Sequence, residues 1–418
     1  MNICLVGVNH QTAPISVREK VTITAEKLYD SLLTLRSYIS QGIILSTCNR
    51  TEIYTIDYDG CHIKTGLGFL KSRLSTESEL KHVYFLENRA AVEHLFGVAC
   101  GLESMIVGEF EVLGQVAHAL GVAEKAGVAN LPLRHLFQSA IHVGRRVREE
   151  TGISKNPVST SSVAVDLATK VVGDLKQRKI LVIGAGEAGR LVVKVARERG
   201  VSQVVVASRS REKAQALAAE LGGTAISSTD LPEELRTTDI VVTCAGAPHW
   251  VLTIDQMRRA MEIRPDVPLV IIDIAVPRNV EPAVSQIENV FLYNIDNLTE
   301  LSNLNRKQRE GEIQKAGETI ASELDKFASW WQDFKVRPLI RAMMSKAEEI
   351  RRSHLDRTMK RLPRLSEEER YSLEMMTKAI VSKILKDPIH GLKASGDVNR
   401  DYAEMVKELF QLDTEDYR

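Results

Sequence analysis

The sequence predicts an α/β protein of three domains, and three patterns along the chain carry that prediction. Residues 1 to about 150 mix short strand-like runs with helices. The next part alternates strands and helices, as is typical of a doubly wound parallel sheet, and from about residue 294 the chain reads as amphipathic helix. Because 418 residues are too many for one core, roughly two to four domains are expected. We place them at 1–152, 153–293 and 294–418.

Composition excludes several classes of protein. The 55 Lys and Arg balance 55 Asp and Glu, so no protein-wide field attracts a nucleic acid, and RNA contacts would need local basic patches. The 5 cysteines are scattered without short paired spacing, which argues against a disulfide framework and a zinc site and indicates a reducing compartment. The chain starts directly with a strand-like run, and no apolar run approaches the roughly 20 residues that span a bilayer. A cytoplasmic protein without a membrane partner is therefore expected.

The most informative stretch of the first domain is Ser46-Thr47-Cys48-Asn49-Arg50-Thr51-Glu52. An apolar run precedes it and a β-rich run follows, so the pattern predicts a strand, a tight polar turn and a second strand. A thiol on such a turn is held by rigid flanks and stays accessible. Arg50 supplies a positive charge that would favour a thiolate or bind an anionic substrate group. The alternative is that Cys48 is simply a small residue in a loop at a strand edge.

Helices make up the rest of the first domain. Residues 92–127 are rich in Ala, Val and Leu and predict mostly helix with glycine interruptions, and 131–150 predicts a further helix with apolar residues near one face. Its basic end, with Arg145, Arg146 and Arg148, is one candidate for RNA contacts, and the surplus of Lys and Arg in 301–362 is another. Basic helix surfaces without any partner are the alternative in both cases.

A glycine motif opens the second domain. The strand 179–183 runs into Gly184-Ala185-Gly186-Glu187-Ala188-Gly189 and then a helix, which is the context that gives the Gly-x-Gly-x-x-Gly pattern its meaning. Gly184 would allow the tight turn, Gly186 the approach of a pyrophosphate, and Gly189 close packing of helix on strand. The helix start offers unpaired N–H groups to phosphates. The loop therefore predicts a dinucleotide site.

The end of the second strand indicates which dinucleotide binds. Strand 203–207 ends at Ser208-Arg209-Ser210, where an acidic residue would select the ribose 2′-hydroxyl of NAD. A guanidinium flanked by hydroxyls suits a 2′-phosphate, so Ser208 and Arg209 favour NADPH. The alternative is a solvated loop arginine. Strands at 239–243 and 269–273 continue the alternation, and 273–278 lies at the carboxyl edge of the sheet, where ligands bind in such folds.

The last domain is predicted to be helical. Apolar residues recur at spacings of three and four from Ile313 to Phe334, which predicts a long amphipathic helix that Pro338 interrupts. A capping box at Ser366 begins a second helix that stops near Pro388, and 398–412 predicts a last one. Such a domain serves self-association or folds as a cap on its own chain, and the pattern leaves both open.

The turn motif at 46–52 resembles the nucleophile motif of the glutamyl-tRNA reductase family. The opening Gly7-Val8-Asn9-His10, followed by Thr12-Ala13-Pro14, resembles the same family, and so does the run from 101 to 115. The resemblance extends over nearly the whole chain. It implies an N-terminal α+β catalytic domain, a Rossmann-type NADPH domain and an all-helical dimerisation domain joined by a long spinal helix.

The resemblance also implies roles for individual residues. Cys48 becomes the nucleophile, and His94, by itself a residue that more often serves structure, becomes important for activity. The implied substrate-binding residues are Thr47, Asn49, Arg50, Ser104, Glu109, Glu111 and Gln115. Glu111 departs from the family, which commonly has Gln there, and a further carboxylate near a glutamate pocket repels mildly unless it points away or pairs with Arg. His10 is placed near the site or else is a turn histidine.

The implied activity is NADPH-dependent reduction of glutamyl-tRNA(Glu) to glutamate-1-semialdehyde through a Cys48 thioester, with release of tRNA, in tetrapyrrole synthesis. The implied partners are a second copy of the chain and, transiently, glutamate-1-semialdehyde aminotransferase. Two other classes stay open from the residues. One is a thiol-dependent reductase of another acyl donor, such as an acyl phosphate. The other is a dimeric NADPH-sensing regulator with a redox-active Cys48. The remaining cysteines, Cys4, Cys61, Cys100 and Cys244, are expected to be packing or incidental residues.

Overall fold

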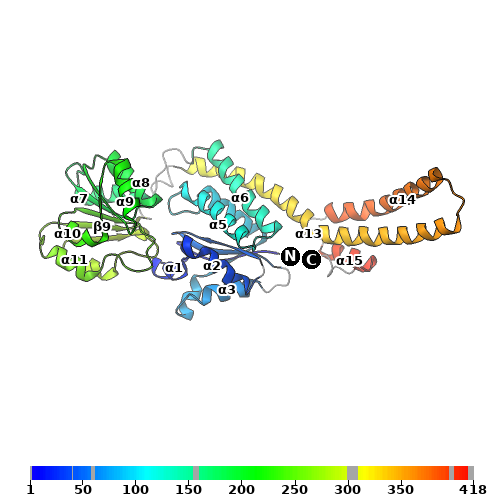
Figure 1. The fold of residues 1–418 in the computed structure, drawn as a ribbon, viewed down its shortest axis with the longest axis horizontal. Coiled ribbons are helices and arrows are strands. Elements are labelled where there is room, and N and C mark those ends of the chain that lie inside the picture. The colour runs from blue at the N-terminus through cyan, green and yellow to red at the C-terminus, as the bar shows by residue number, and fades with distance from the viewer. Residues whose placement is uncertain are drawn as a thin grey trace. The chain divides into compact units, whose positions relative to one another are not determined.

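The structure is a computed structural model that describes residues 2–39, 41–57, 62–153, 160–298, 309–394 and 400–412. The chain divides into two compact units, Met1–Glu323 and Leu324–Arg418. Figure 1 shows two sheets with their helices in the first unit and paired helices in the second. Cys61, residues 154–159 just after the first predicted domain boundary and the start of the basic stretch at 301–362 lie outside the described residues.

An antiparallel sheet of four strands begins the first unit. Its order is β2-β3-β1-β4, with β1 Asn2–Asn9, β2 Gly42–Ser46, β3 Arg50–Asp57 and β4 Tyr84–Glu87. Its helices are α1 Ile15–Val21, α2 Ala25–Arg36, α3 His62–Lys71, α4 Asn88–Cys100, α5 Glu111–Lys125 and α6 Leu131–Glu150. Every residue of β3 is buried, so this strand is covered on both faces.

The predicted local structure of this part is confirmed in most places. β2 and β3 flank the predicted turn, and α6 has the predicted bounds. The predicted helical stretch 92–127 is broken where α4 ends at Gly101, which adopts a φ of 77° that favours glycine. A loop without regular structure then leads to α5, and this loop carries three of the expected site residues, Ser104, Glu109 and, at its end, Glu111.

A parallel sheet of six strands forms the rest of the first unit. Its order is β10-β9-β8-β5-β6-β7, with β5 Lys179–Ile183, β6 Gln203–Ala207, β7 Thr224–Ile226, β8 Ile240–Thr243, β9 Leu269–Asp273 and β10 Val290–Asn294. Helices α7 Thr160–Val172, α8 Glu187–Glu198, α9 Arg211–Leu221, α10 Leu231–Glu234 and α11 Ile254–Met261 connect the strands or precede them. The order reverses between β5 and β8, so the doubly wound prediction is confirmed. The crevice for a ligand is expected at the carboxyl ends of these two strands.

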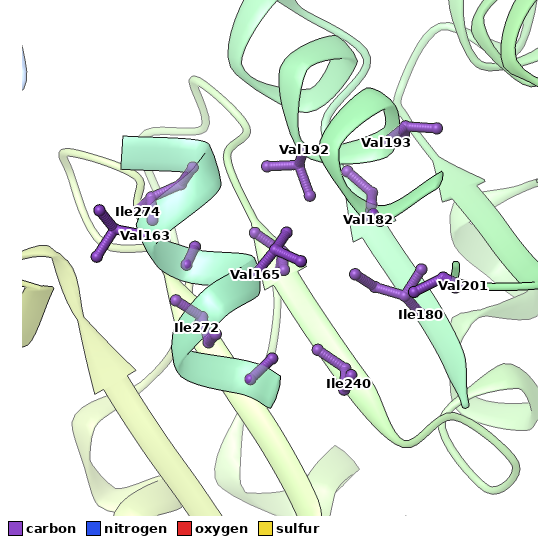
Figure 2. Close-up of a cluster of buried hydrophobic side chains, with 14 of the residues drawn as sticks. Val163, Val165, Ile180, Val182, Val192, Val193, Val201, Ile240, Ile272 and Ile274 are labelled. Atoms are coloured by element: carbon purple, nitrogen blue, oxygen red, sulfur yellow. The ribbon is translucent and has the colours of Figure 1, made fainter. Parts of the chain in front are cut away.

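Alternation along β5 builds an apolar cluster on each face of this sheet. Ile180 and Val182 belong to one cluster, while Leu181 and Ile183 belong to the other. Figure 2 shows the first cluster, in which Val163 and Val165 of α7 lie beside strand residues such as Ile272. Because both faces are covered, the strands read as continuous apolar runs.

The second unit is helical, and two expected helix ends are wrong. Helix α13, Glu310–Arg361, continues through Pro338, and α14, Glu367–Ala394, continues through Pro388. A proline removes only one helical hydrogen bond and bends the axis. Packing offsets this cost, because Leu339 and Met343 of α13 share an apolar cluster with Leu385 and Leu392 of α14. The last helix, α15, spans Arg400–Leu409.

The predicted capping box at Ser366 is confirmed. The Ser366 N–H donates to Oε2 of Glu369 at 2.8 Å, and the Glu369 N–H donates to Oγ of Ser366 at 3.2 Å. None of the described helices combines the length and the apolar composition that crossing a bilayer requires.

Candidate active site

The turn that carries Cys48 is held together by Thr47. The Thr47 N–H donates to the carbonyl of Arg50 at 2.8 Å. Its hydroxyl oxygen accepts from the N–H groups of Asn49 at 3.1 Å and Arg50 at 3.3 Å. These bonds close the end of the β2–β3 hairpin and leave Cys48 at its tip. Thr47, expected to bind substrate, is thus also the residue that fixes the geometry of the turn.

Alternation along β3 places Arg50, Glu52 and Tyr54 on one face of the strand. Nη1 of Arg50 donates to Oε1 of Glu52 at 2.9 Å, and the hydroxyl of Tyr54 donates to Oε2 at 2.6 Å. Tyr84 donates to Oε1 at 2.6 Å, and Nε2 of His94 lies 2.9 Å from the same oxygen. A fully buried carboxylate therefore has a complete set of partners, as a buried charge requires.

Gly7 provides the room for this carboxylate. It lies directly opposite Glu52 in the pairing of β1 with β3. A Cβ on Gly7 would lie 2.8 Å from Cγ of Glu52 and 3.2 Å from the ring of Tyr84. The glycine of the opening motif is therefore required by the side chains packed across from it, and by no unusual backbone angle.

The charges and the burial of the site shift the pKa values of Glu52 and Cys48. Burial alone would raise the pKa of Glu52, but His94 and Arg50 hold that pKa well below its usual range. The charge of Arg50 is thus already compensated. Burial, with smaller contributions from Glu109 and Glu111, raises the pKa of the Cys48 thiol to about 12, and the cation that opposes this shift is Arg18. The charge of Arg50 is paired with Glu52, and Arg50 is not among the main groups that shift the pKa of Cys48, so binding of an anionic substrate group is the expected role that this arrangement favours.

The loop after α4 brings its polar residues to the same turn. Nη2 of Arg50 donates to the carbonyl of Glu103, and Nδ2 of Asn49 lies 3.4 Å from Oε1 of Glu109. Gly108 has a φ of 84°, and a Cβ there would overlap the carbonyl of Ile153, so the loop is tightly folded. Burial raises the pKa of Glu109, which brings its carboxyl group closer to the neutral form.

Several buried polar atoms around the turn lack a hydrogen-bond partner among the described residues. His10 lies beside the turn, because its backbone N–H donates to the carbonyl of Asn49 at 2.9 Å. Burial lowers the pKa of His10 to about 3, so this ring is neutral. The unpartnered atoms are Nδ1 of His10, Oδ1 of Asn49, Nε of Arg50 and Oγ of Ser104. Buried polar groups are rarely left unpaired, so this set is available to a bound ligand.

Glu111 and Gln115 lie one helical turn apart at the start of α5. Glu111 acts on the Cys48 thiol by raising its pKa, so it lies close enough to repel a negative charge there. It makes no ion pair within the described part of the chain, so a neighbouring arginine does not remove this repulsion. Gln115 is half-buried and makes no hydrogen bond that fixes its amide among the described residues.

The glycine motif has the geometry that a dinucleotide needs. Gly184 has a φ of 127°, and Gly186 is the N-cap of α8 without a side-chain cap. A Cβ on Gly189 would overlap the carbonyl of Gly184, so helix and strand pack as closely as expected. A Cβ on Gly186 would meet no atom within 4 Å, which leaves space for a phosphate at the uncapped helix start. The residues present therefore fit a dinucleotide.

The remaining predicted cofactor residues line the two strand ends next to this loop. Ala185 and Ala188 are half-buried, Glu187 is exposed as the first residue of α8, and no acidic side chain follows β6. Ser208 is half-buried and Arg209 is exposed. Cys48 and Ala185 both pack against the apolar cluster that contains Val182, so the nucleophile turn lies beside the dinucleotide fold.

Comparisons with known proteins agree with this arrangement. Residues 6–151 match the family model "Glutamyl-tRNAGlu reductase, N-terminal domain", 166–301 match "Shikimate / quinate 5-dehydrogenase", and 315–412 match "Glutamyl-tRNAGlu reductase, dimerisation domain". The glutamyl-tRNA reductase of Natranaerobius thermophilus is 38% identical over 99% of this chain and 93% of its own length. The chain belongs to the glutamyl-tRNA reductase family.

Two further members of the glutamyl-tRNA reductase family show the same extent of similarity. The protein from Moorella thermoacetica is 40% identical over 99% of this chain and 95% of its own length. The solved structure of the protein from Methanopyrus kandleri is 33% identical, with a TM-score of 0.53, and covers 98% of this chain and 99% of its own. The middle part of the present chain has the nucleotide-binding fold of pyridine-nucleotide enzymes.

Two of the three arginines at the basic end of α6 are engaged within the chain, while Arg145 is exposed. Arg146 pairs with Glu150 at 2.6 Å and with Glu323 at 2.7 Å. Arg148 donates to three backbone carbonyls, those of Ala99, Gly144 and Glu109. Both guanidinium groups are thus engaged within the chain, and Arg148 holds the loop that carries Glu109.

Sequence reasoning missed five residues at the site: Arg18, Glu52, Tyr54, Tyr84 and Asp296. Glu52 stood inside the quoted motif, and its spacing of two from both Arg50 and Tyr54 on a predicted strand was the signal that could have found it. No local signal pointed to the pairing of Arg18 with Asp296, because these residues are 278 positions apart.

Proposed function

We propose that this protein reduces glutamyl-tRNA(Glu) to glutamate-1-semialdehyde with NADPH, through a thioester on Cys48. One observation carries the proposal: the nucleophile turn and the glycine loop pack against the same apolar cluster, and unpartnered polar atoms surround the turn. A candidate nucleophile, the unpartnered polar atoms around it and a dinucleotide loop thus belong to one compact unit.

The first step is attack of the Cys48 thiolate on the ester carbonyl that joins glutamate to tRNA. The tRNA leaves as an alcohol and takes up one proton, and the glutamyl group stays on sulfur as a thioester. Acyl transfer to sulfur prepares the carbonyl carbon for hydride, because a thioester is more electrophilic than the oxygen ester that it replaces. Burial raises the pKa of the Cys48 thiol to about 12, so the proposed attack requires that the thiol loses its proton when the substrate binds.

NADPH, when bound at the glycine loop, supplies the hydride that the thioester carbon accepts. The resulting thiohemiacetal on Cys48 collapses to the aldehyde, and the sulfur leaves as a thiolate that recovers a proton. His94 is held by Glu52 at 2.9 Å and is the group that we assign to proton transfer or orientation of the substrate. The 2′-phosphate of the cofactor would be held by Ser208 and Arg209.

The unpartnered atoms account for recognition of glutamate. Nε of Arg50 offers a donor to the substrate carboxylate, while Oδ1 of Asn49 and Oγ of Ser104 offer further polar contacts. Glu109 would accept from the ammonium group of glutamate, which would lower the raised pKa of its carboxyl group. Thr47 fixes the turn, and Gln115 offers an amide on the adjoining helix. Glu111 is the member of this set that we expect to weaken binding.

Dimerisation is proposed through the second unit. Exposed apolar side chains include Met376, Ile380 and Ile384 of α14 and Leu409 at the end of α15. They line a groove of about 610 Å³ between α13 and α14. Because large apolar patches are seldom left in water, a second copy of the matched dimerisation domain is the occupant that we assign. We further propose that the aldehyde passes to glutamate-1-semialdehyde aminotransferase for tetrapyrrole synthesis.

The alternative of a regulator with a redox-active Cys48 predicts NADPH binding without oxidation of NADPH by glutamyl-tRNA. The test of the proposed reaction is single-turnover oxidation of NADPH with glutamyl-tRNA, in the unmodified protein and in Cys48→Ser. Oxidation that requires glutamyl-tRNA and is absent in Cys48→Ser supports the proposal. Oxidation with a glutamyl phosphate but not with glutamyl-tRNA would identify the other acyl donor.

A further inference from the structure

Helix α1 carries two consecutive charged residues that bind the carboxyl edge of the parallel sheet. Arg18 pairs with Asp296, which lies in the short helix η4, Ile295–Asn297, directly after β10. Glu19 pairs with Arg278 in the loop after β9, with its two carboxylate oxygens 2.9 Å from Nε and 2.6 Å from Nη2. Because β9 and β10 are neighbouring strands, both pairs hold the helix to one edge of the sheet.

Arg18 also reaches the nucleophile turn. Its Nη1 donates to the carbonyl oxygen of Cys48 at 2.6 Å, while its Nη2 donates to Oδ1 of Asp296. The Arg18 side chain is 2% exposed, and its Nε has no partner among the described residues. A single buried guanidinium therefore joins the backbone of the nucleophile to a carboxylate of another domain.

Asp296 has a second role at the same contact. Its Oδ2 accepts from the N–H of Ile15 at 3.0 Å, at the first residue of α1. This N–H has no partner within the helix, so Asp296 caps α1 from another part of the chain. The position of Arg18 relative to Cys48 thus depends on where η4 docks.

The charges that face Cys48 come from three elements. Arg18 of α1 favours the thiolate, and Glu109 of the loop and Glu111 of α5 disfavour it. Asp296 lies on the far side of Arg18 and compensates the charge that Arg18 presents to the sulfur. Loss of Asp296 and loss of Arg18 should therefore act on the thiol in opposite directions.

We propose that Arg18 is a positioning residue for Cys48 and that Asp296 controls it. While η4 is docked on α1, the Arg18 charge is shared between a carboxylate and the turn, and Cys48 is held in a less reactive state. Without the negative charge of Asp296, the full charge of Arg18 would act on the nucleophile turn. This inference rests on the proposed function only in taking Cys48 as the nucleophile.

The test is the pH dependence of Cys48 alkylation by iodoacetamide in the full chain, without tRNA or NADPH. Trypsin releases residues 37–50, in which Cys48 is the single cysteine, so its labelling can be followed separately by mass spectrometry. We expect Asp296→Asn to lower the pH midpoint of Cys48 alkylation by about one unit. At pH values below this midpoint, labelling should then be about tenfold faster. We expect Arg18→Met to raise the midpoint and slow labelling by about tenfold or more.

Glu19→Gln is the matched control, because it removes the neighbouring ion pair of the same helix and leaves in place the pairing of Arg18 with Asp296 and its hydrogen bond to Cys48. Its labelling should stay within about twofold of the unmodified protein. If Arg18→Met fails to fold, Asp296→Asn against Glu19→Gln still decides the question. The proposal is overturned if Asp296→Asn leaves the midpoint unchanged or raises it, or if Glu19→Gln shifts it equally. None of these outcomes depends on the reductase activity.

Discussion

Arg50 and Glu52 form an ion pair inside the first sheet, with Nη1 2.9 Å from Oε1 and both side chains excluded from solvent. The pair decides what Arg50 does for the site. Its charge is compensated by Glu52, its Nη2 is bound to a carbonyl, and only Nε remains for a ligand. Arg18 is the cation that lowers the pKa of the Cys48 thiol.

Replacing Glu52 by Gln should destabilise the protein strongly. The change leaves the Arg50 guanidinium buried without a counter-charge, which costs about 3–5 kcal/mol in the free energy of unfolding. Equilibrium urea unfolding at pH 7 measures it. The control is Glu19→Gln, the same chemical change at a partly exposed pair, for which about 1 kcal/mol or less is expected. Equal losses in the two variants would contradict the role of burial.

The same carboxylate should make stability fall in acid. The pKa of Glu52 is lower in the folded chain than in the unfolded one, so its stabilisation is complete above the unfolded value of about 4.3 and is lost as the pH falls towards the folded value. Glu52→Gln lacks this titration. Between pH 5 and pH 3, its free energy of unfolding should therefore change less than that of the unmodified protein. This window follows from the unfolded value of about 4.3. Parallel curves would rule out Glu52 as the titrating group.

Gly7→Ala should cost about 1–3 kcal/mol of stability, because the added methyl group meets Glu52 and Tyr84 in a filled interior. The matched variant is Gly68→Ala in α3, where a Cβ meets no atom within 4 Å. That change should stabilise by about 0.5–1 kcal/mol, since alanine favours helix. Thermal unfolding of the two variants compares them directly. A neutral Gly7→Ala would mean that the carboxylate site is not tightly packed.

Two substitutions in the glycine loop should have different effects, one on cofactor binding and the other on stability. Gly186→Ala should leave the melting temperature unchanged, because its Cβ enters open space, yet weaken NADPH binding by about tenfold or more. Gly189→Ala should lower the melting temperature instead, because its Cβ overlaps the Gly184 carbonyl. Fluorescence titration and thermal unfolding give the two readings. Unchanged NADPH binding in Gly186→Ala would place the pyrophosphate elsewhere.

Arg209→Gln tests the choice of cofactor. A charge-assisted hydrogen bond to the 2′-phosphate is worth about 1.5–3 kcal/mol, so NADPH should bind about tenfold to a hundredfold more weakly. NADH lacks the phosphate and should bind as before, and the ratio of the two dissociation constants is the measurement. Equal weakening of both would show that Arg209 does not read the phosphate.

Local patterns predicted the parts of the fold that are local in origin. The β2–β3 turn, the strand and glycine loop at 179–189 and helix 131–150 are each written within about twenty residues of sequence. The helix breaks predicted at Pro338 and Pro388 were wrong, because tertiary packing in the second unit outweighs the loss of one helical hydrogen bond.

The candidate site was predicted as a set of residues but not as a network. The motif around Cys48 named the nucleophile turn, yet the partners of Glu52 come from β3, β4 and α4, and the residue that holds the Cys48 carbonyl comes from α1. Such pairings depend on register and on contacts between distant segments, and no local pattern records them.

Transfer of labelled glutamate from tRNA to the protein, without NADPH, tests the Cys48 thioester most directly. The unmodified protein should retain the label after denaturation, and the tryptic fragment 37–50 should carry it. Treatment with hydroxylamine should remove the label. Cys48→Ser should form no hydroxylamine-labile thioester. Label on another fragment, or equal thioester labelling of Cys48→Ala, would contradict the assignment of Cys48 as the nucleophile.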